Sequence, residues 1–541
     1  MKNIKLLTYY LKYFKNKKKI IFVILILTLT NLTLGITFPG LIQRLIDEAI
    51  LLKNSEKMIE ISIRISVIFF LTIIISYLQS YLALIFSNEF IYYYKVKFLK
   101  KFFDASYSKI EEKNIGNVIN LFESDLSTVT GFCQTVIFGI ITNFIQLIGL
   151  FYYLYVLNNK IALMTAGIFS VYFIAVRMTH RYFNRVSRFL RSKNLKINSF
   201  VYERFYNVFF IKSLSKADNE LKKYELCYRD FLKGYYSVSK MNMMIDSLKD
   251  FISFYGSVVI VLYSGFLVIY GEITTGTLFA ANTLFGAIYQ PASFFVNLRL
   301  NFYKILVSFE KLKEFLECPE ENLKGRNLDE AKVIKLENIT FSYKGNINVL
   351  ENFTAEFNKG QIKLLKGPNG SGKSTLAFLK TGFYIEKLSS GKITINDYDI
   401  KEINVKSLRN KIVYMPQKVE IFSGELKNFM EIKKEEFFEK MEKIKRYEIG
   451  DILLQKGSEY YINQGANNLS GGERQRIYLA NLLLNDYDFY IFDEFESAQD
   501  VINRENLKNV IKILKENGKG IILITHSNYF DDICDDIINL K

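Results

Sequence analysis

The sequence predicts a multidomain membrane protein. An all-α domain of six transmembrane helices with long cytosolic helical extensions is followed by an α/β P-loop nucleotide-binding domain. Three observations lead to this fold class. Half of the 541 residues are hydrophobic, and the long apolar runs end before residue 300. The excess positive charge lies with those runs, and a glycine-rich segment, GPNGSGKST, follows an apolar strand in the second half. A chain of this length has room for two or three domains.

Cysteine, histidine and charge exclude several other classes. Four cysteines lie far apart without a C-x-x-C spacing, and only His180 and His526 could supply imidazole ligands. A disulfide scaffold, a zinc site and a haem site are therefore not expected. Residues 1–320 hold 38 Lys and Arg against 22 Asp and Glu, whereas residues 321–541 hold 33 of each. Positive charge beside membrane spans follows the positive-inside rule, so no nucleic-acid partner is expected.

Six apolar runs without internal charge predict the transmembrane helices, because about 20 helical residues cross the hydrocarbon layer. Pro39 is expected to end the first helix. Pro291 is expected to interrupt the sixth, which a bundled membrane helix tolerates. The fourth run is short and is expected to continue past Arg177 as it leaves the bilayer. The predicted spans are approximately residues 20–42, 65–86, 129–157, 161–182, 251–270 and 277–298.

Charge in the connecting segments predicts the orientation of these helices. Residues 1–19 carry seven Lys, residues 87–128 carry six, and residues 177–250 carry sixteen Lys and Arg. The connectors on the other side carry five in total. We therefore expect a multi-pass protein of the cytoplasmic membrane with both termini in the cytosol. The first apolar run is too long for a signal-peptide core and is expected to remain as a span.

The two long cytosolic connectors have apolar residues at helical spacing and little Pro or Gly. This pattern predicts helices that continue out of the membrane and opposes disordered loops. Their tips, near residues 107–112 and 205–214, are expected to dock on another part of the protein. The predicted organisation is a membrane domain at 1–318, a polar linker at 319–332 and a nucleotide-binding domain at 333–541.

The segment GPNGSGKST predicts a phosphate-binding loop, because it follows the expected strand IKLL and opens a helix. Successive backbone N–H groups can converge on phosphate oxygens, and the helix N-terminus adds a favourable dipole. Lys373 is expected to reach the β- and γ-phosphates, and Ser374 to supply an oxygen to Mg²⁺. The residues of this loop expected to bind ATP are Gly367, Pro368, Asn369, Gly370, Ser371, Gly372, Lys373, Ser374 and Thr375.

An apolar segment ending in two acids, FYIFDE, predicts a buried parallel strand whose carboxyl end faces the nucleotide. Asp493 is expected to hold magnesium through water. Glu494 is expected to orient and polarise the attacking water as general base. Two acids alone would more often form a solvated turn, so this interpretation depends on the phosphate-binding loop in the same chain.

A second phosphate-binding segment is predicted at NLSGGERQR, where small residues precede an apolar helix. One chain has no obvious need for two such surfaces. The economical interpretation is a dimer, in which each P-loop phosphate is also held by the partner subunit. The residues expected to contact ATP in this way are Ser470, Gly471, Gly472 and Glu473.

In this order, the P-loop, LSGGE, FDE and a terminal histidine segment resemble the ATP-binding cassette exporters, specifically half-transporters with a fused membrane domain. The resemblance spans nearly the whole chain. It implies that Tyr343 in FSYKG stacks on adenine, and that Gln417 in YMPQK contacts magnesium and the membrane-domain arms and joins the catalytic group. It also implies that His526 in LITHS contacts the γ-phosphate and that Asp500 in SAQD lies at the dimer interface. Alone, each of these residue types is more often structural.

The sequence departs from the family pattern in three places. Gln464 precedes the LSGGE segment where exporters of this group usually have Glu, so communication with the arms is expected to differ. Phe495, Glu496 and Gln499 replace commoner residues after Glu494. The sequence ends fifteen residues after His526, without the usual C-terminal helices. None of these changes removes an expected phosphate, magnesium or water ligand, so a competent ATPase is expected.

The resemblance implies ATP-driven export of a hydrophobic or amphipathic substrate, such as a peptide, a lipid or a drug, by alternating access of a dimer. The predicted spans contain no Asp, Glu, Lys or Arg in their central parts. Most of their Asn and Gln residues are expected to serve helix packing. The alternatives are an ATP-binding membrane regulator or a non-autonomous subunit of a heterodimer, a soluble ATPase acting on nucleic acid, and an importer. The complete motif set allows a homodimer without requiring it.

Overall fold

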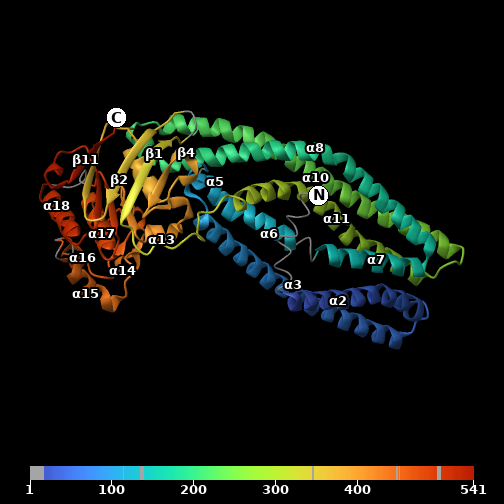
Figure 1. The fold of residues 1–541 in the computed structure, drawn as a ribbon. Coiled ribbons are helices and arrows are strands. Elements are labelled where there is room, and N and C mark those ends of the chain that lie inside the picture. Colours follow the sequence, from blue (N-terminus) through green and yellow to red (C-terminus); the bar gives the residue numbers. More distant parts are fainter. Residues whose placement is uncertain are drawn as a thin grey trace. The chain divides into compact units, whose positions relative to one another are not determined.

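The computed structural model describes residues 17–113, 115–134, 139–343, 347–445, 447, 449, 451–495 and 501–540. The chain divides into two compact units. One is helical and comprises residues 1–101 and 113–317. The other is the α/β cassette, comprising residues 318–541 together with the short segment 102–112 (Figure 1). The first cytosolic arm tip therefore belongs to the cassette unit, although it lies over 200 positions earlier in the sequence.

The helical unit contains four helices of 42 residues or more, which extend well beyond the predicted membrane spans. Helices α8 and α10 pack side by side along most of their length (Figure 1). The described elements are α2 (Lys18–Arg44), the π-helix η2 (Leu45–Ile50), α3 (Ser55–Asp104), α5 (Ile115–Asn120), the π-helix η3 (Leu121–Asp125), α6 (Leu126–Gln134), α7 (Ile140–Leu157), α8 (Asn159–Tyr206), α9 (Val208–Ser213), α10 (Ala217–Ile269) and α11 (Thr275–Leu316).

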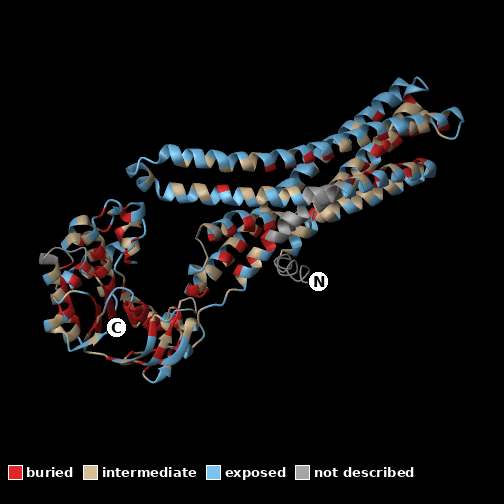
Figure 2. Ribbon diagram, turned by 90° about the horizontal axis from the view of Figure 1, so that it is seen from above, coloured by how far each residue is buried: buried red, intermediate tan, exposed pale blue. Residues whose placement is uncertain are grey.

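By length and composition, four helical stretches among the described residues could cross a bilayer. They are Lys18–Ile50, Ser55–Asp104, Ile140–Leu157 and Ala217–Ile269. The expected spans at 161–182 and 277–298 fall in α8 and α11, parts of which lie outside the described residues. Many residues of the helical unit are exposed (Figure 2). Large apolar residues are among them, as they would be where lipid surrounds them.

Local signals explain where several helices begin and end. The side chain of Asn158 accepts hydrogen bonds from Lys160 and Ile161 and so caps α8, and Thr274 caps α11 in the same way. Pro291 lies inside α11 as expected. The prediction that Pro39 ends the first helix is wrong, because α2 continues through it to Arg44. A proline removes only one backbone hydrogen bond, and packing in a helical unit can compensate for that loss.

The cassette contains a parallel five-stranded sheet and an antiparallel four-stranded sheet (Figure 1). The parallel sheet has the order β11-β3-β10-β9-β6, and the antiparallel sheet has the order β2-β1-β4-β5. The parallel strands are β3 (Ile362–Lys366), β6 (Ile412–Met415), β9 (Phe489–Asp493), β10 (Gly520–Ile524) and β11 (Asp536–Asn539); the antiparallel strands are β1 (Val333–Phe341), β2 (Leu350–Asn358), β4 (Leu388–Ile395) and β5 (Tyr398–Asp399).

Helices cover the sheets and form a second lobe of the cassette, which also holds the small pair β7 (Gly424–Glu425) and β8 (Tyr461–Ile462). The helices are α12 (Lys373–Lys380), α13 (Val405–Arg409), α14 (Leu426–Phe429), α15 (Lys434–Lys445), α16 (Asp451–Lys456), α17 (Gly471–Leu483) and α18 (Val501–Glu516). Together, these elements bear out the α/β P-loop domain that the sequence predicts.

The continuous apolar character of β9 and β10 follows from burial on both faces of the parallel sheet. Successive residues of β9 alternate between two cores: Phe489 and Ile491 pack on one side, and Tyr490 and Phe492 on the other. Every residue of both strands is buried. An alternating polar pattern is therefore absent, as expected for a strand between two layers of side chains. This arrangement places the acids that end β9 at the edge of the sheet.

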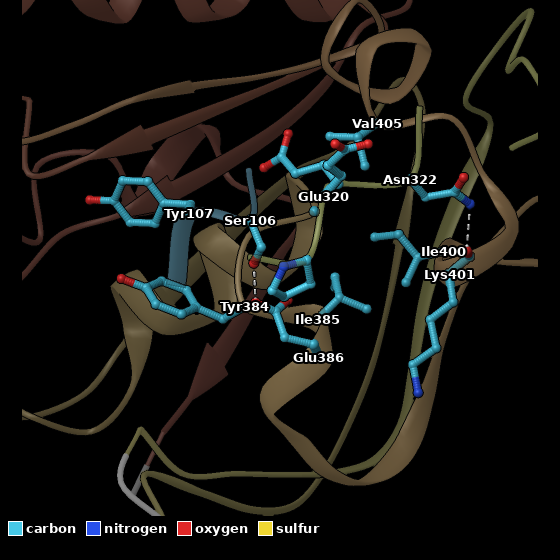
Figure 3. A pocket seen from close by; sticks show the side chains of 13 residues that line it. Ser106, Tyr107, Glu320, Asn322, Tyr384, Ile385, Glu386, Ile400, Lys401 and Val405 are labelled. Carbon is cyan, nitrogen blue, oxygen red and sulfur yellow. Dashed lines mark hydrogen bonds between the residues drawn. The ribbon is translucent and has the colours of Figure 1, made fainter. Parts of the chain in front are cut away.

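The first arm tip, α4 (Tyr107–Glu111), packs within the cassette unit. The ring centroid of Tyr107 lies 5.1 Å from that of Phe383 and 5.6 Å from that of Tyr384. The Tyr384 hydroxyl donates to the Glu111 carboxylate at 2.6 Å. These contacts confirm that residues 107–112 dock on another part of the chain. Figure 3 shows Tyr107 and Tyr384 at this junction, beside a cleft of about 230 Å³ that the residues after the helical unit also line.

Candidate nucleotide-binding site

The predicted phosphate-binding loop connects β3 to α12, as a P-loop should. Gly372 is the N-cap of α12 and has a φ of +90°, a conformation that favours glycine. A Cβ on this residue would lie 2.6 Å from a methyl carbon of Leu350. Among the described residues, no side chain caps α12. The first N–H groups of the helix are therefore left for a ligand, and the helix dipole favours an anionic one.

Two polar side chains of the loop are held close to it. The Lys373 ammonium donates to the carbonyl oxygens of Gly367 and Pro368, at 2.8 and 2.9 Å. The Ser371 hydroxyl is buried and has no hydrogen-bond partner among the described residues. Lys373 would have to leave two neutral acceptors to meet a phosphate, and charge-assisted hydrogen bonds are the stronger kind. The loop as folded is thus suited to receive a phosphate chain.

The two acids at the end of the buried strand β9 lie in different surroundings. Asp493 is 4% exposed, accepts a hydrogen bond from the Tyr414 hydroxyl at 2.8 Å and lies beside the Ser374 hydroxyl. Burial raises the pKa of Asp493 above its usual value, and these two hydroxyl groups oppose that shift. Ser374 and Asp493, two of the three residues predicted to serve magnesium, are therefore neighbours.

Glu494 joins two other predicted site residues. One carboxylate oxygen accepts a hydrogen bond from the Gln417 side chain at 2.6 Å, and the other lies 3.1 Å from His526 Nε2. Its backbone has a φ of +44°, which is uncommon for a residue with a side chain. The backbone N–H of Glu494 donates to the carbonyl of Ile524 at 2.8 Å, which helps to hold this conformation. Residues from three distant segments therefore meet at the carboxyl ends of β9 and β10.

Tyr343 lies against the same loop. Its hydroxyl lies 3.0 Å from the hydroxyl of Thr375, and its ring centroid is 5.2 Å from that of Tyr384. Burial raises the pKa of the Tyr343 hydroxyl. An aromatic ring at the edge of a P-loop offers a surface on which a base can stack. Residues 344–346 lie outside the described residues, as does Asp500.

The LSGGE segment forms the first turn of α17, and hydrogen bonds within the segment satisfy two of its backbone N–H groups. The Ser470 hydroxyl accepts from the backbone N–H of Glu473, and the Glu473 carboxylate accepts from the backbone N–H of Ser470. These reciprocal bonds make a capping box. The bond from Ser470 N–H, together with Lys456 at 3.0 Å, lowers the pKa of Glu473 to about 2. Within the described part of the chain, no hydrogen bond joins residues 470–473 to residues 367–375.

The donors present fit Mg²⁺ bound with a phosphate chain. Ser374, Asp493 and Gln417 offer hydroxyl, carboxylate and amide oxygens, which are the hard ligands that Mg²⁺ prefers, and Mg²⁺ usually takes its other ligands from water and substrate phosphates. Among the described residues, no group of three or more His, Cys, Asp and Glu could hold a metal by itself. This site therefore suits a metal that arrives with the nucleotide.

The structure also shows residues around this site that the sequence analysis did not single out. Tyr414 bonds to Asp493, and Tyr384 links α4 to Tyr343. Both tyrosines lie in apolar segments, where an aromatic residue predicts only a place in the core. The spacing of the motifs carries no signal for either contact. The side chain of His180, expected to carry only orientation charge, lies outside the described residues.

Comparison with known proteins agrees with this geometry. Residues 21–292 match the family described as ABC transporter transmembrane region, and residues 350–497 match the family described as ABC transporter. The chain therefore belongs to the ABC transporters. It is an exporter-type half-transporter, in which a membrane domain is fused to an ATP-binding cassette and ATP hydrolysis is coupled to transport.

The relatives include exporters of two kinds. The chain is 27% identical over 524 residues to the lactococcin-G-processing and transport ATP-binding protein of Lactococcus lactis subsp. lactis, covering 94% of this chain and 74% of that protein. It is 23% identical to a protein of Bacillus subtilis (strain 168) named for multidrug export, covering 96% and 93%. A solved bacterial Atm1-family ABC exporter with ATP bound has the same fold, with a TM-score of 0.85 at 16% identity over 97% and 93% of the two chains.

Proposed function

We propose that the protein exports a hydrophobic or amphipathic substrate across the cytoplasmic membrane, using ATP hydrolysis at the site built around Glu494. The observation that carries this proposal is the pair of contacts on the two oxygens of the Glu494 carboxylate, a hydrogen bond from Gln417 and a 3.1 Å contact with His526 Nε2. A general base must be oriented toward the water that it activates, and a partner on each oxygen restricts the rotation of the carboxylate. Lys373 and the backbone of the P-loop would hold the phosphates. Bound magnesium would neutralise charge on the phosphate oxygens.

The test of the catalytic assignment is ATP hydrolysis by the full-length protein in lipid nanodiscs, comparing wild type with Glu494→Gln. We expect turnover to fall by roughly 10²-fold or more while ATP binding is retained, since the amide cannot accept the proton. A matched control is Glu505→Gln, because this exposed carboxylate also accepts a side-chain hydrogen bond, from Tyr529, but lies outside the site. Turnover by Glu494→Gln at the wild-type rate would exclude Glu494 as the base.

The proposed working form is a dimer of two copies, each with six spans and cytosolic termini. Ser470 and its neighbours face solvent within one chain and have a complete capping box, so their surface is available to the ATP of the partner subunit. The tip of the second arm supports the same interpretation, because the Phe209 side chain is 83% exposed and Phe205 is 77% exposed. A partner cassette would cover these rings. A heterodimer with a related chain is the second candidate.

Disulfide crosslinking distinguishes these arrangements. Two tagged copies lacking native cysteines would carry Asn369→Cys and Ser470→Cys respectively, in a Glu494→Gln background that retains ATP. We expect an ATP-dependent crosslink between the two tags. As a control, Lys443→Cys on the exposed face of α15 replaces Ser470→Cys and should not crosslink. A doubly substituted copy that crosslinks only within itself would contradict the dimer interface.

The proposed cargo is amphipathic because the predicted spans have no charged residue in their central parts, and polar side chains there have partners within the helical unit. Asn31 donates to Ser76 at 2.9 Å, and Asn143 donates to the Gly139 carbonyl at 2.7 Å. Cargo would therefore be recognised through apolar contact and shape rather than through charge. The names of the relatives point to peptides and to drugs. Stimulation of ATP hydrolysis by amphipathic peptides, lipids and hydrophobic drugs in the nanodisc assay distinguishes these classes.

A further inference from the structure

Tyr414 reaches the acid at the end of β9 from the neighbouring strand. Strand β6 pairs in parallel with β9, with Tyr414 opposite Ile491 and Met415 opposite Phe492. From this position the Tyr414 hydroxyl donates to Asp493 Oδ2 at 2.8 Å. Asp493 is almost completely buried, so each hydrogen bond to it replaces one that water would otherwise make. The bond is thus part of how this buried carboxylate is held.

The hydrogen bond restricts the orientation of the carboxylate. The terminal torsion of an aspartate is broad, and a carboxylate without directional partners samples a wide range of angles. Donation from Tyr414 to one oxygen limits that range, and the Ser374 hydroxyl lies beside the same carboxylate. A phenol is ordinarily protonated at neutral pH, so Tyr414 can act as the donor. Among the described residues, no hydrogen bond joins the Tyr414 hydroxyl to residues 367–375.

The position of the Tyr414 ring is fixed by aromatic neighbours. Its centroid lies 5.4 Å from that of Phe378 on α12, in an edge-to-face arrangement. Phe378 in turn lies 5.8 Å from Tyr384, and Tyr384 lies 5.6 Å from Tyr107 in α4. Edge-to-face pairs have a preferred geometry and resist displacement. The four rings therefore form a continuous aromatic cluster inside the cassette unit, from the arm tip to the carboxylate.

We propose that Tyr414 is a positioning residue for Asp493, holding the carboxylate in the orientation that receives magnesium, and that the aromatic cluster makes this orientation sensitive to α4. The inference rests on the proposed role of Asp493 in magnesium binding. It adds a contact from the arm tip to the metal site that does not pass through Gln417. A merely structural Tyr414 would affect folding or all nucleotide binding equally, whereas a positioning Tyr414 affects the response to magnesium.

The test measures binding of a fluorescent ATP analogue to the full-length protein in nanodiscs, first in EDTA and then during a magnesium titration. All variants carry Glu494→Gln to prevent hydrolysis. For Tyr414→Phe we expect the half-saturating magnesium concentration to rise by roughly tenfold, as for a lost hydrogen bond to a charged group. Affinity in EDTA should stay within about twofold of the parent. Tyr478→Phe is the matched control, because the Tyr478 hydroxyl donates to the backbone carbonyl of Tyr414, at 3.4 Å, and within the described part of the chain makes no hydrogen bond to Asp493.

The variants test three claims separately: the positioning role of Tyr414, the role of Asp493 in magnesium binding and the link to α4. An unchanged magnesium response in Tyr414→Phe, or an equal loss of affinity with and without magnesium, overturns the positioning role. Asp493→Asn tests the underlying assignment. If that variant responds to magnesium like the parent, the proposed role of Asp493 fails, whatever Tyr414→Phe does. A magnesium response that is normal in Tyr107→Leu but shifted in Tyr414→Phe overturns the link to α4. We expect Tyr107→Leu to shift the response in the same direction by a smaller factor.

Discussion

Helices α12 and α17 both begin at predicted phosphate-binding segments, but their first turns are satisfied in opposite ways. Helix α12 begins at Gly372 without a side-chain cap, so its orphan N–H groups need a ligand. Helix α17 begins at Ser470 with both bonds of a capping box already made. The comparison indicates that the first surface is completed by the nucleotide. The second is complete in its own subunit and is available to a nucleotide held elsewhere.

The largest effect is expected at α12. Lys373→Ala removes the only side-chain cation of the loop, and we expect ATP affinity to fall by about 100-fold or more because charge-assisted bonds to phosphate are lost. Stability without nucleotide should change little, since the ammonium bonds only to two carbonyls of its own loop. Nucleotide binding and thermal unfolding of the full-length protein measure the two quantities. Lys443→Ala, an exposed lysine on α15, is the control. If Lys373→Ala lowered the thermal stability as strongly as the ATP affinity, the expectation that Lys373 serves binding rather than stability would be contradicted.

The next largest effect is expected on the rate of ATP hydrolysis when Ser470, at the N-terminus of α17, is substituted. Ser470→Ala should lower ATP hydrolysis by roughly tenfold or more by removing a contact made only when two subunits close. Binding of ATP at the P-loop should be unchanged. Lys456→Met is the matched control, because it removes the ion pair with Glu473 at 3.0 Å and so perturbs the same capping box, while all the residues expected to contact ATP are kept. If both variants lose turnover equally, the effect comes from the cap and not from a contact with ATP.

A third effect concerns the far end of α12. Lys380 is fully buried with no hydrogen-bond partner among the described residues, and its Nζ lies 3.5 Å from the centroid of the Phe357 ring. Burial lowers its pKa well below the usual value. At pH values between the folded and the unfolded pKa, the unfolded chain binds a proton that the folded chain does not, and the resulting loss of stability is present at every pH below the unfolded pKa.

Lys380→Met should accordingly stabilise the cassette, by about 2 kcal/mol at pH 7, because it removes a buried polar group while conserving volume. The gain should shrink as pH rises toward the ordinary pKa of lysine, where the unfolded state also loses its proton. Hydrogen exchange of the α12 amides in the full-length protein, measured from pH 6 to pH 9, reports the stability difference between Lys380→Met and wild type. A loss of stability on substitution would show that the ammonium is held favourably by the Phe357 ring.

The smallest effect is a pH dependence at the capping box of α17. The pKa of Glu473 is lowered to about 2, so its stabilising contribution is present above its ordinary pKa and is lost as pH falls from there toward 2. Glu473→Gln should destabilise α17 by about 1 kcal/mol at pH 7, and the difference from wild type should narrow below pH 4.5. Hydrogen exchange of the α17 amides measures this stability difference between Glu473→Gln and wild type. A difference that is constant with pH would show that charge is not involved.

Features built from residues close together in the sequence could be predicted, whereas contacts between distant segments could not be predicted from the residues alone. The strand–loop–helix arrangement of the P-loop was predicted because the three parts are contiguous, and Gly372 must serve both the turn and the helix N-terminus. The apolar run of β9 predicted its burial and the placement of the two acids. The contacts of Glu494 with Gln417 and His526 could be anticipated only through the family resemblance, because three segments separated by tens of residues must meet.

The sequence by itself determined the class of the protein, the strand–loop–helix arrangement of the P-loop, and the separation of a membrane part from a cassette. Each of these features depends on composition or on residues close together in the chain. Local backbone preferences and hydrophobic periodicity are enough to determine them. Only the tertiary structure decided that Tyr414 bonds to Asp493, that α4 packs beside Tyr384 and that Lys380 is buried against Phe357. These contacts depend on strand order and side-chain packing, which bring together residues that no motif relates.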